Sequence, residues 1–162
     1  MIVKLKNKKG LEFDAEIFVA TKPDLKLLTK DWKFNWLKLN SSNSIIYKIS
    51  IENKIQGLIK LEEENDSYYV LKNIEVAPSN FGAKGEFQNT AEILMAFACL
   101  KSFELNIGNY KGYLVFTSKG TLIEYYQNKY QAELIFRERM IINPKKGKQL
   151  IKTYLKINLN NE

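Results

Sequence analysis

The sequence contains no histidine and only one cysteine, and these shortages narrow the chemistry that the chain can perform. Without histidine, the usual zinc ligand, the commonest general base and the Ser-His and Cys-His nucleophile systems are excluded. Cys99 lies in an apolar helical stretch, so we expect a small core residue in a reducing compartment rather than a disulfide or a reactive thiol. Acid–base chemistry would therefore fall to carboxylates, tyrosine or lysine, and we expect no metal site.

Long apolar runs, repeats and domain linkers are also missing. No window approaches the roughly 20 apolar residues of a membrane span. The N-terminal ten residues carry charge but no apolar core of signal-peptide length. We therefore expect a cytoplasmic protein that forms one domain over residues 1–162, with no membrane partner, because a chain of this length can bury a core without disulfides.

The net charge of +7 is concentrated at the two ends of the chain. Residues 1–40 carry nine lysines against five acids, and residues 143–162 carry five lysines against one glutamate. Lysine-rich ends usually form solvated surface, which is the interpretation that we favour. A surface for nucleic acid or for an acidic partner is the weaker alternative.

Apolar periodicity in the first half predicts strands around two short helical segments. Alternation over residues 2–6 and 11–19 predicts a hairpin with one buried face. Apolar residues at spacings of three and four over residues 25–37 predict one or two short helices, whose two tryptophans we expect in the core. Three further strands, at residues 44–51, 55–61 and 68–76, predict an antiparallel meander with an acidic turn at 62–66.

The second half is predicted to alternate helices with strands. Residues 79–85 form a glycine-containing loop after Pro78, and Asn89 with Glu92 resembles a capping box that starts a long central helix. The near-continuous apolarity of residues 112–117 suggests a buried strand that pairs in parallel with the strand before the loop. The remaining pattern predicts a helix at 119–130, strands at 134–136 and 139–142, and an amphipathic helix or tail at 149–156.

The stretch from Ile74 to Cys99 carries the clearest chemical signal. A strand that delivers a glycine-containing loop to a helix N-terminus brings free backbone N–H groups and the positive end of the helix dipole together. Such an arrangement is suited to hold an anion.

Three motifs in this order resemble those of the GNAT superfamily of acyl-CoA-dependent N-acyltransferases. They are Val76-Ala77-Pro78 at the strand end, Asn80-x-x-Ala83-x-Gly85 in the loop, and Leu122-Ile123-Glu124-Tyr125-Tyr126 in the later helix. Asn80 stands where the family usually has Gln or Arg, and Ala83 where it usually has Gly. Ser102-Phe103-Glu104 and the segment 112–116 are similar to a small, mainly uncharacterised bacterial branch of the superfamily.

The resemblance implies an α+β fold in three layers. Its mixed, mostly antiparallel central sheet would have a parallel pair splayed at the cofactor site and helices on both faces. Within the single domain, residues 1–43 would supply the N-terminal hairpin and acceptor-side helices, residues 44–142 the acyl-CoA-binding core, and residues 143–162 a basic C-terminal helix or tail.

The resemblance also implies an N-acyltransferase, foremost an N-acetyltransferase, that moves an acyl group from acyl-CoA to a primary amine by direct attack. Glu75 would be the base, with a raised pKa if it faces the cleft; a structural or substrate-orienting role is the alternative. Tyr126 would protonate the leaving thiolate, with Tyr125 as the competing candidate and simple packing as the alternative. The residues implied to bind acetyl-CoA or another acyl-CoA are Ile74, Val76, Ala77, Asn80, Phe81, Gly82, Ala83, Lys84, Gly85, Asn89 and Thr90.

The expected partners are acyl-CoA and a small-molecule or protein amine, for a monomer or a homodimer. An inactive member of the fold that serves protein interaction is one alternative function. An acyltransferase or binder that acts on tRNA is a further one, which rests only on the lysine-rich ends.

Overall fold

The structure, a computed structural model, describes residues 1–160, which form two compact units. The N-terminal unit comprises residues 1–60 and 73–94, and the C-terminal unit comprises residues 61–72 and the chain from residue 95 onward. Strands β4 (Lys54–Glu64) and β5 (Tyr68–Val76) and helix α3 (Thr90–Leu105) run through both units. The single-domain division of the sequence stays a prediction.

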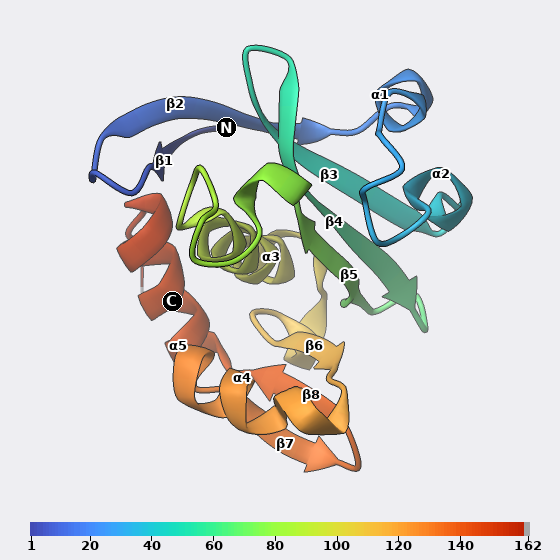
Figure 1. The fold of residues 1–162 in the computed structure, drawn as a ribbon. Coiled ribbons are helices and arrows are strands. Elements are labelled where there is room, and N and C mark those ends of the chain that lie inside the picture. Colours follow the sequence, from blue (N-terminus) through green and yellow to red (C-terminus); the bar gives the residue numbers. More distant parts are fainter. Residues whose placement is uncertain (161–162) are drawn as a thin grey trace. The chain divides into compact units, whose positions relative to one another are not determined.

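The N-terminal unit is built on antiparallel strands in the order β1-β2-β3-β4-β5, and Figure 1 shows the β1–β2 hairpin next to β3. Val3, Ala15 and Ile17 are buried in the hairpin while their chain neighbours are exposed, which confirms the predicted alternation. Its remaining elements are β1 (Ile2–Lys6), β2 (Glu12–Val19), α1 (Lys22–Lys26), α2 (Trp36–Leu39), β3 (Ser44–Ile51) and a 3₁₀ turn (Pro78–Asn80).

Two short helices lie at the ends of the stretch for which one or two were predicted, and they contribute Leu25 and Trp36 to a small apolar cluster. Trp36 is 1% exposed and lies in this cluster with Leu25, Ile46 and Leu58, whereas Trp32 packs against it and stays half-exposed. Helix α1 is started by Thr21, whose side chain and that of Asp24 form a capping box, with proline in the first turn.

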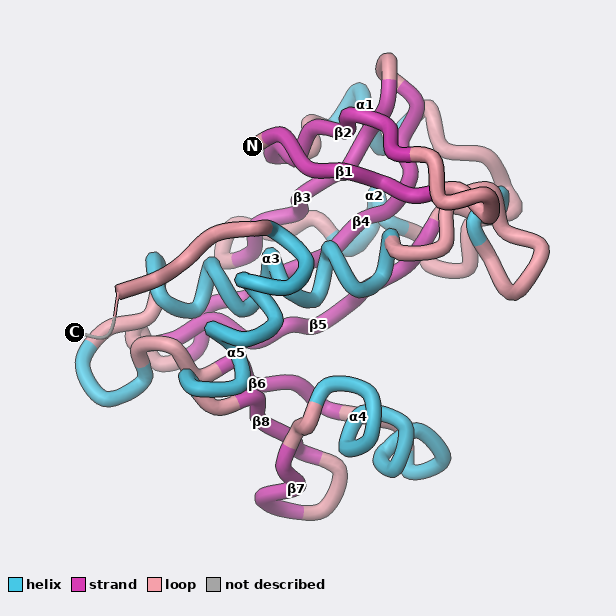
Figure 2. The backbone as a smooth tube through the Cα atoms, turned by 90° about the vertical axis from the view of Figure 1, so that its left-hand side faces the viewer, coloured by secondary structure: helices cyan, strands magenta, loops and turns pink. Residues whose placement is uncertain are grey.

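The C-terminal unit continues the sheet in the order β4-β5-β6-β8-β7, and Figure 2 shows β6, β8 and β7 together with α4 beside them. Its elements are a 3₁₀ turn (Gly108–Tyr110), β6 (Leu114–Thr117), a 3₁₀ turn (Gly120–Leu122), α4 (Ile123–Tyr130), β7 (Glu133–Phe136), β8 (Arg139–Ile142), α5 (Pro144–Leu150) and a π-helical turn (Ile151–Leu155).

The β5–β6 pair is the parallel one that the apolar run predicted. Val70 pairs with Val115 and Leu71 with Phe116, and this pairing ends there although β5 extends to Val76. The eight-stranded mixed sheet with one parallel pair and helices on its faces confirms the predicted α+β fold.

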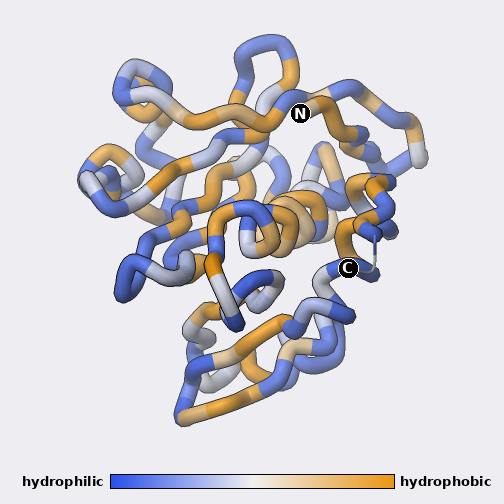
Figure 3. The backbone as a smooth tube through the Cα atoms, turned by 180° about the vertical axis from the view of Figure 1, so that it is seen from behind, coloured by the Kyte–Doolittle hydropathy of each residue, from blue (hydrophilic) through white to orange (hydrophobic). Residues whose placement is uncertain are grey.

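Helix α3 is apolar around most of its circumference, which confirms its predicted central position. Every residue from Ile93 to Leu100 is buried, and Figure 3 shows this helix in the colours of hydrophobic residues. Its first turn packs closely on β4, because a Cβ at Gly57 would lie 2.8 Å from a methyl carbon of Leu94. In the C-terminal unit the packing is looser, since a Cβ at Gly147 of α5 would lie 3.5 Å from the Cβ of Cys99, an ordinary contact.

Two local predictions were wrong. The last helix begins at Pro144 and not at residue 149, because Asn143 caps it by accepting from the Lys146 amide at 2.9 Å. The acidic turn is also shorter than predicted, since the residues up to Glu64 belong to β4. The chain reverses at Asn65 and Asp66, both in the left-handed conformation that a tight hairpin turn requires.

Candidate functional site

The loop that follows β5 is held by the side chain of Asn80. Asn80 is buried, and its Nδ2 donates to the backbone oxygen of Gln56 at 3.1 Å and to Gln56 Oε1 at 2.9 Å. Its Oδ1 accepts from the Phe87 amide at 3.0 Å. Asn80 therefore ties both ends of the loop to β4. Its side chain supports the backbone of the candidate anion site and is not free to contact a ligand.

Two glycines allow the loop its course. Gly82 has φ +73°, which an L side chain rarely adopts, and a Cβ at Gly85 would lie within 2.6 Å of the Asn80 carbonyl carbon. The loop is closed by Gly85 N donating to Gly82 O at 3.0 Å and by Glu86 N donating to Ser79 O at 2.8 Å. The two hydrogen bonds thus hold the backbone of residues 79–86 in a tight turn.

Three consecutive amides of this loop remain available. Among the residues that the structure describes, the N–H groups of Gly82, Ala83 and Lys84 have no hydrogen-bond acceptor. Successive amides around a left-handed residue form a concavity suited to an anion. The exposed side chains of Phe81 and Lys84 stand on the same loop, and Lys84 adds a positive charge.

The start of α3 is the second half of this predicted cradle. Asn89 accepts from the Lys6 amide at 2.8 Å and donates to the Lys4 oxygen at 3.1 Å, so its side chain secures the helix start to β1. Thr90 begins the helix, as predicted to within one residue, and is buried. Its Oγ1 has no hydrogen-bond partner among the described residues, which leaves one unsatisfied polar atom at this helix end.

Glu75 anchors a loop that lies far away in the sequence. Its Oε2 accepts from the Lys33 amide at 2.6 Å, and its Oε1 accepts from the Phe34 amide at 3.1 Å and from Trp36 Nε1 at 2.9 Å. Two donors from the loop between α1 and α2, and one from the first residue of α2, thus converge on one half-buried carboxylate. Nothing in the local pattern around Glu75 signals these partners.

The other strand residues of the predicted site lie beside Glu75 in the N-terminal unit. Ile74 and Val76 are half-buried, and Ala77 is buried with its amide donating to the Gln56 oxygen at 2.8 Å. The structure therefore groups all the predicted cofactor-binding residues with Glu75 in one unit, whereas Tyr126 belongs to the C-terminal unit.

Tyr126 is a half-buried member of an aromatic cluster. Its ring meets that of Phe116 edge-on at 5.0 Å between centroids and lies 6.1 Å from Tyr130. Burial first, and the neighbouring Tyr125 second, raise the pKa of the Tyr126 hydroxyl above its ordinary value. The hydroxyl therefore stays protonated at neutral pH, as a proton donor must.

Within residues 1–160, no group of three or more Cys, Asp or Glu side chains could hold a metal ion. Over the same residues, no helix is long and apolar enough to cross a bilayer.

Solved structures share this fold, although no protein-family profile and no curated protein sequence matches the chain. The KacTA–DNA complex has a TM-score of 0.63 at 12% identity, over 86% of this chain and 99% of its own. A mutant AtaT toxin, bound to the C-terminus of the antitoxin AtaR and to acetyl-CoA, has a TM-score of 0.60 at 12% identity, over 86% and 99%. Spermidine N-acetyltransferase from Vibrio cholerae, in complex with CoA and spermine, has a TM-score of 0.52 at 16% identity, over 82% and 97%. The chain therefore has the fold of the GNAT acetyltransferases.

Proposed function

We propose that the protein is an acyl-CoA-dependent N-acyltransferase, foremost an N-acetyltransferase, whose acceptor is a primary amine. The observation that carries the proposal is the fold shared with a protein solved with acetyl-CoA bound, over 86% of this chain and 99% of that one. The loop after β5 supports it independently, because its features are those that a diphosphate needs.

The fit of that loop to coenzyme A rests on its free donors. The three amides of residues 82–84, the Lys84 ammonium and the N-terminus of α3 would together hold the pyrophosphate. In this proposal the backbone groups of Ile74 and Val76 contact pantetheine, as the superfamily resemblance implies.

The reaction needs one proton removed and one proton delivered. As the amine nitrogen bonds to the thioester carbonyl carbon, the C–S bond breaks and the sulfur leaves as a thiolate. Tyr126 would give its hydroxyl proton to that thiolate. The raised pKa of Tyr126 keeps the hydroxyl protonated until this transfer. Glu75 would take the ammonium proton; its carboxylate accepts three hydrogen bonds and retains one of about four lone-pair sites for this task.

Isothermal titration with acetyl-CoA tests the proposal directly. We expect saturable binding, and release of free CoA thiol when a panel of primary amines is added. Tyr126→Phe should bind acetyl-CoA as the parent protein does but turn over more slowly, by on the order of 10²-fold. Tyr125→Phe is the matched control on the same helix.

The outcomes separate the alternatives. No binding of acetyl-CoA at millimolar concentration would remove the acyltransferase and favour an inactive interaction protein with this fold. Equal losses in the two tyrosine variants would reject the specific role of Tyr126.

A nucleic-acid-borne amine, such as that of charged tRNA, is a second candidate acceptor. One structure with this fold is a complex with DNA, and both ends of this chain are rich in lysine. Affinity for tRNA that falls steeply as salt rises would favour this candidate, because phosphate contacts release counterions.

A further inference from the structure

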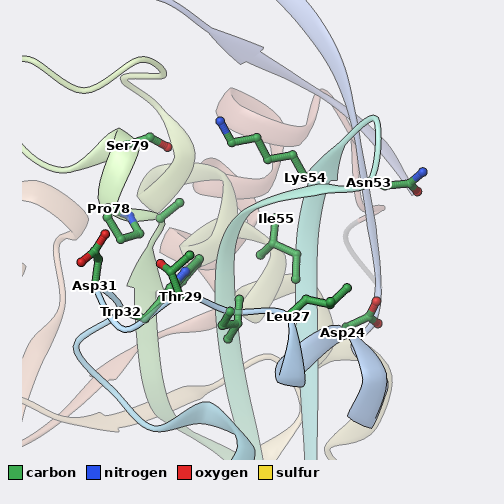
Figure 4. Close-up of a pocket in the computed structure, with 12 residues that line it drawn as sticks. Asp24, Leu27, Thr29, Asp31, Trp32, Asn53, Lys54, Ile55, Pro78 and Ser79 are labelled. Carbon is green, nitrogen blue, oxygen red and sulfur yellow. The ribbon is translucent and has the colours of Figure 1, made fainter.

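A pocket of about 380 Å³ lies in the N-terminal unit, beside the turn that leads into the candidate anion loop. Three segments line it: the end of α1 with the loop that follows, the start of β4, and the turn after β5 (Figure 4). This volume falls at the lower end of the range for small-molecule sites. The pocket could therefore hold a compact ligand and not an extended one.

The floor of the pocket is apolar and firmly supported. Leu28, Trp32 and Ile55 are half-buried, line the pocket and pack against the buried cluster around Trp36. Because the cluster fixes these three side chains, the floor is formed before any ligand arrives. It is suited to an aliphatic or aromatic group.

Three charged side chains line the pocket, and one of them already has a partner. Asp24 forms an ion pair with Lys48 at 2.9 Å and takes part in the capping box with Thr21. Asp31 and Lys54 are different, since neither side chain forms an ion pair or a hydrogen bond within residues 1–160. Figure 4 shows the Asp31 carboxylate on the side of Pro78 and the Lys54 ammonium on the side of Ser79.

We propose that this pocket binds a zwitterion, namely an α-amino acid with an apolar side chain. The ammonium group lies at Asp31, the carboxylate lies at Lys54, and the side chain lies on the apolar floor. A pure cation such as a polyamine would leave Lys54 facing a like charge, and a pure anion would do the same to Asp31. Only a ligand with both charges pairs both groups.

Three ligands of the same shape test this assignment. L-Leucine carries both charges, isoamylamine lacks the carboxylate, and 4-methylpentanoate lacks the ammonium. Binding is followed by tryptophan fluorescence, with and without saturating coenzyme A, because Trp32 lines the pocket while Trp36 is 1% exposed. We expect L-leucine to bind about tenfold more tightly than either analogue, the size of one charge-assisted contact.

Two variants connect this preference to the two charges. Lys54→Gln should make L-leucine and isoamylamine bind equally, and Asp31→Asn should do the same for L-leucine and 4-methylpentanoate. Lys9→Gln and Asp66→Asn remove the same charges from exposed hairpin turns and should leave the tenfold preference intact. Trp32→Phe should abolish the fluorescence change without abolishing binding measured by calorimetry.

Equal affinity for the three ligands, or no binding of L-leucine at millimolar concentration in either condition, would overturn the inference. Its failure is distinguishable from that of the proposed function. Binding of acetyl-CoA without binding of L-leucine would reject the zwitterion pocket alone. Binding of L-leucine without acetyl-CoA would reject the acyltransferase and leave the pocket assignment standing.

Discussion

At the scale of single residues, Glu75 has an observed structural task beside the catalytic task that we propose for it. The proposed reaction uses its carboxylate as a base, while the structure uses the same group to hold the loop at Lys33 and Phe34 and the indole of Trp36. A carboxylate accepts from all three donors, because both of its oxygens are acceptors only. The structural task explains the Glu75 carboxylate, which lies between the apolar residues Ile74 and Val76, without reference to catalysis.

The first prediction concerns Glu75→Gln. The glutamine amide must turn its NH₂ group toward at least one of the three donors, so we expect a loss of about 1–3 kcal/mol in the free energy of unfolding. Urea unfolding measures this loss. Glu16→Gln, on an exposed position of β2, should change stability by less than about 0.5 kcal/mol.

Turnover and stability measured on the same variant distinguish the two tasks of Glu75. A variant as stable as the parent protein but slower in turnover would show that the base role dominates. A less stable variant with unchanged turnover of its folded fraction would leave only the structural role.

The sequence could propose site residues but not the contacts that each one makes. The superfamily resemblance implied Asn80 and Glu75 as site residues, and their roles stay predictions. The contacts that define them involve Gln56, 24 residues away, and the loop at Lys33 to Trp36, 39 to 42 residues away. Local periodicity carries no information about such long-range partners.

At the scale of elements, prediction succeeded where burial repeats along the chain. The alternation in β1 and β2 determines which face is buried, whereas the unbroken apolar run in α3 indicates burial around most of the helix. The structure confirms both. Pro144 was less informative, because a proline can end a strand and also occupy the first turn of a helix. The capping side chain of Asn143 resolves this choice in favour of the helix.

The second prediction concerns substitution of the glycines in the loop after β5. Gly85→Ala places a methyl group against the Asn80 carbonyl, so the loop must open. We expect at least a tenfold loss of acetyl-CoA affinity in calorimetry, because the free amides of residues 82–84 move with the loop.

A glycine on another turn is the matched control for this loop. Gly10→Ala and Gly82→Ala both put alanine at a positive φ with open space around the Cβ, so each should cost about 1–2 kcal/mol of stability. Only Gly82→Ala should also weaken acetyl-CoA binding. Equal binding by Gly85→Ala and Gly10→Ala would contradict a role of this loop in holding the diphosphate.

At the scale of the whole molecule, stability should decline at both extremes of pH. Burial alone would raise the pKa of Asp24, but Thr21 and Lys48 outweigh it and hold the pKa below its ordinary value. Glu64 is likewise lowered, because Tyr68 and Arg139 outweigh its burial. A carboxyl with a lowered pKa in the folded state stabilises it above the unfolded pKa, and this stabilisation is lost as pH falls through the folded pKa.

At alkaline pH, stability is lost as pH rises, and the main source of this loss is the Cys99 thiol. Burial raises the pKa of the Cys99 thiol from its ordinary 9.0 to about 12, so between these values the unfolded thiol ionises while the folded one does not. Each pH unit in that window then lowers the free energy of unfolding by about 1.4 kcal/mol. The raised pKa of Tyr126 adds to this loss only above its ordinary 10.0.

The third prediction is therefore that Cys99→Ala flattens the alkaline side of the stability profile. The variant should be less stable than the parent protein at pH 7, because alanine fills less of the space beside Gly147. Between pH 9 and 10.5 the parent should lose about 2 kcal/mol more than the variant, measured by urea unfolding at each pH. Because ionisation of the tyrosines affects both proteins equally, parallel profiles would mean that the thiol ionises in the folded state and that α3 opens to solvent at this position.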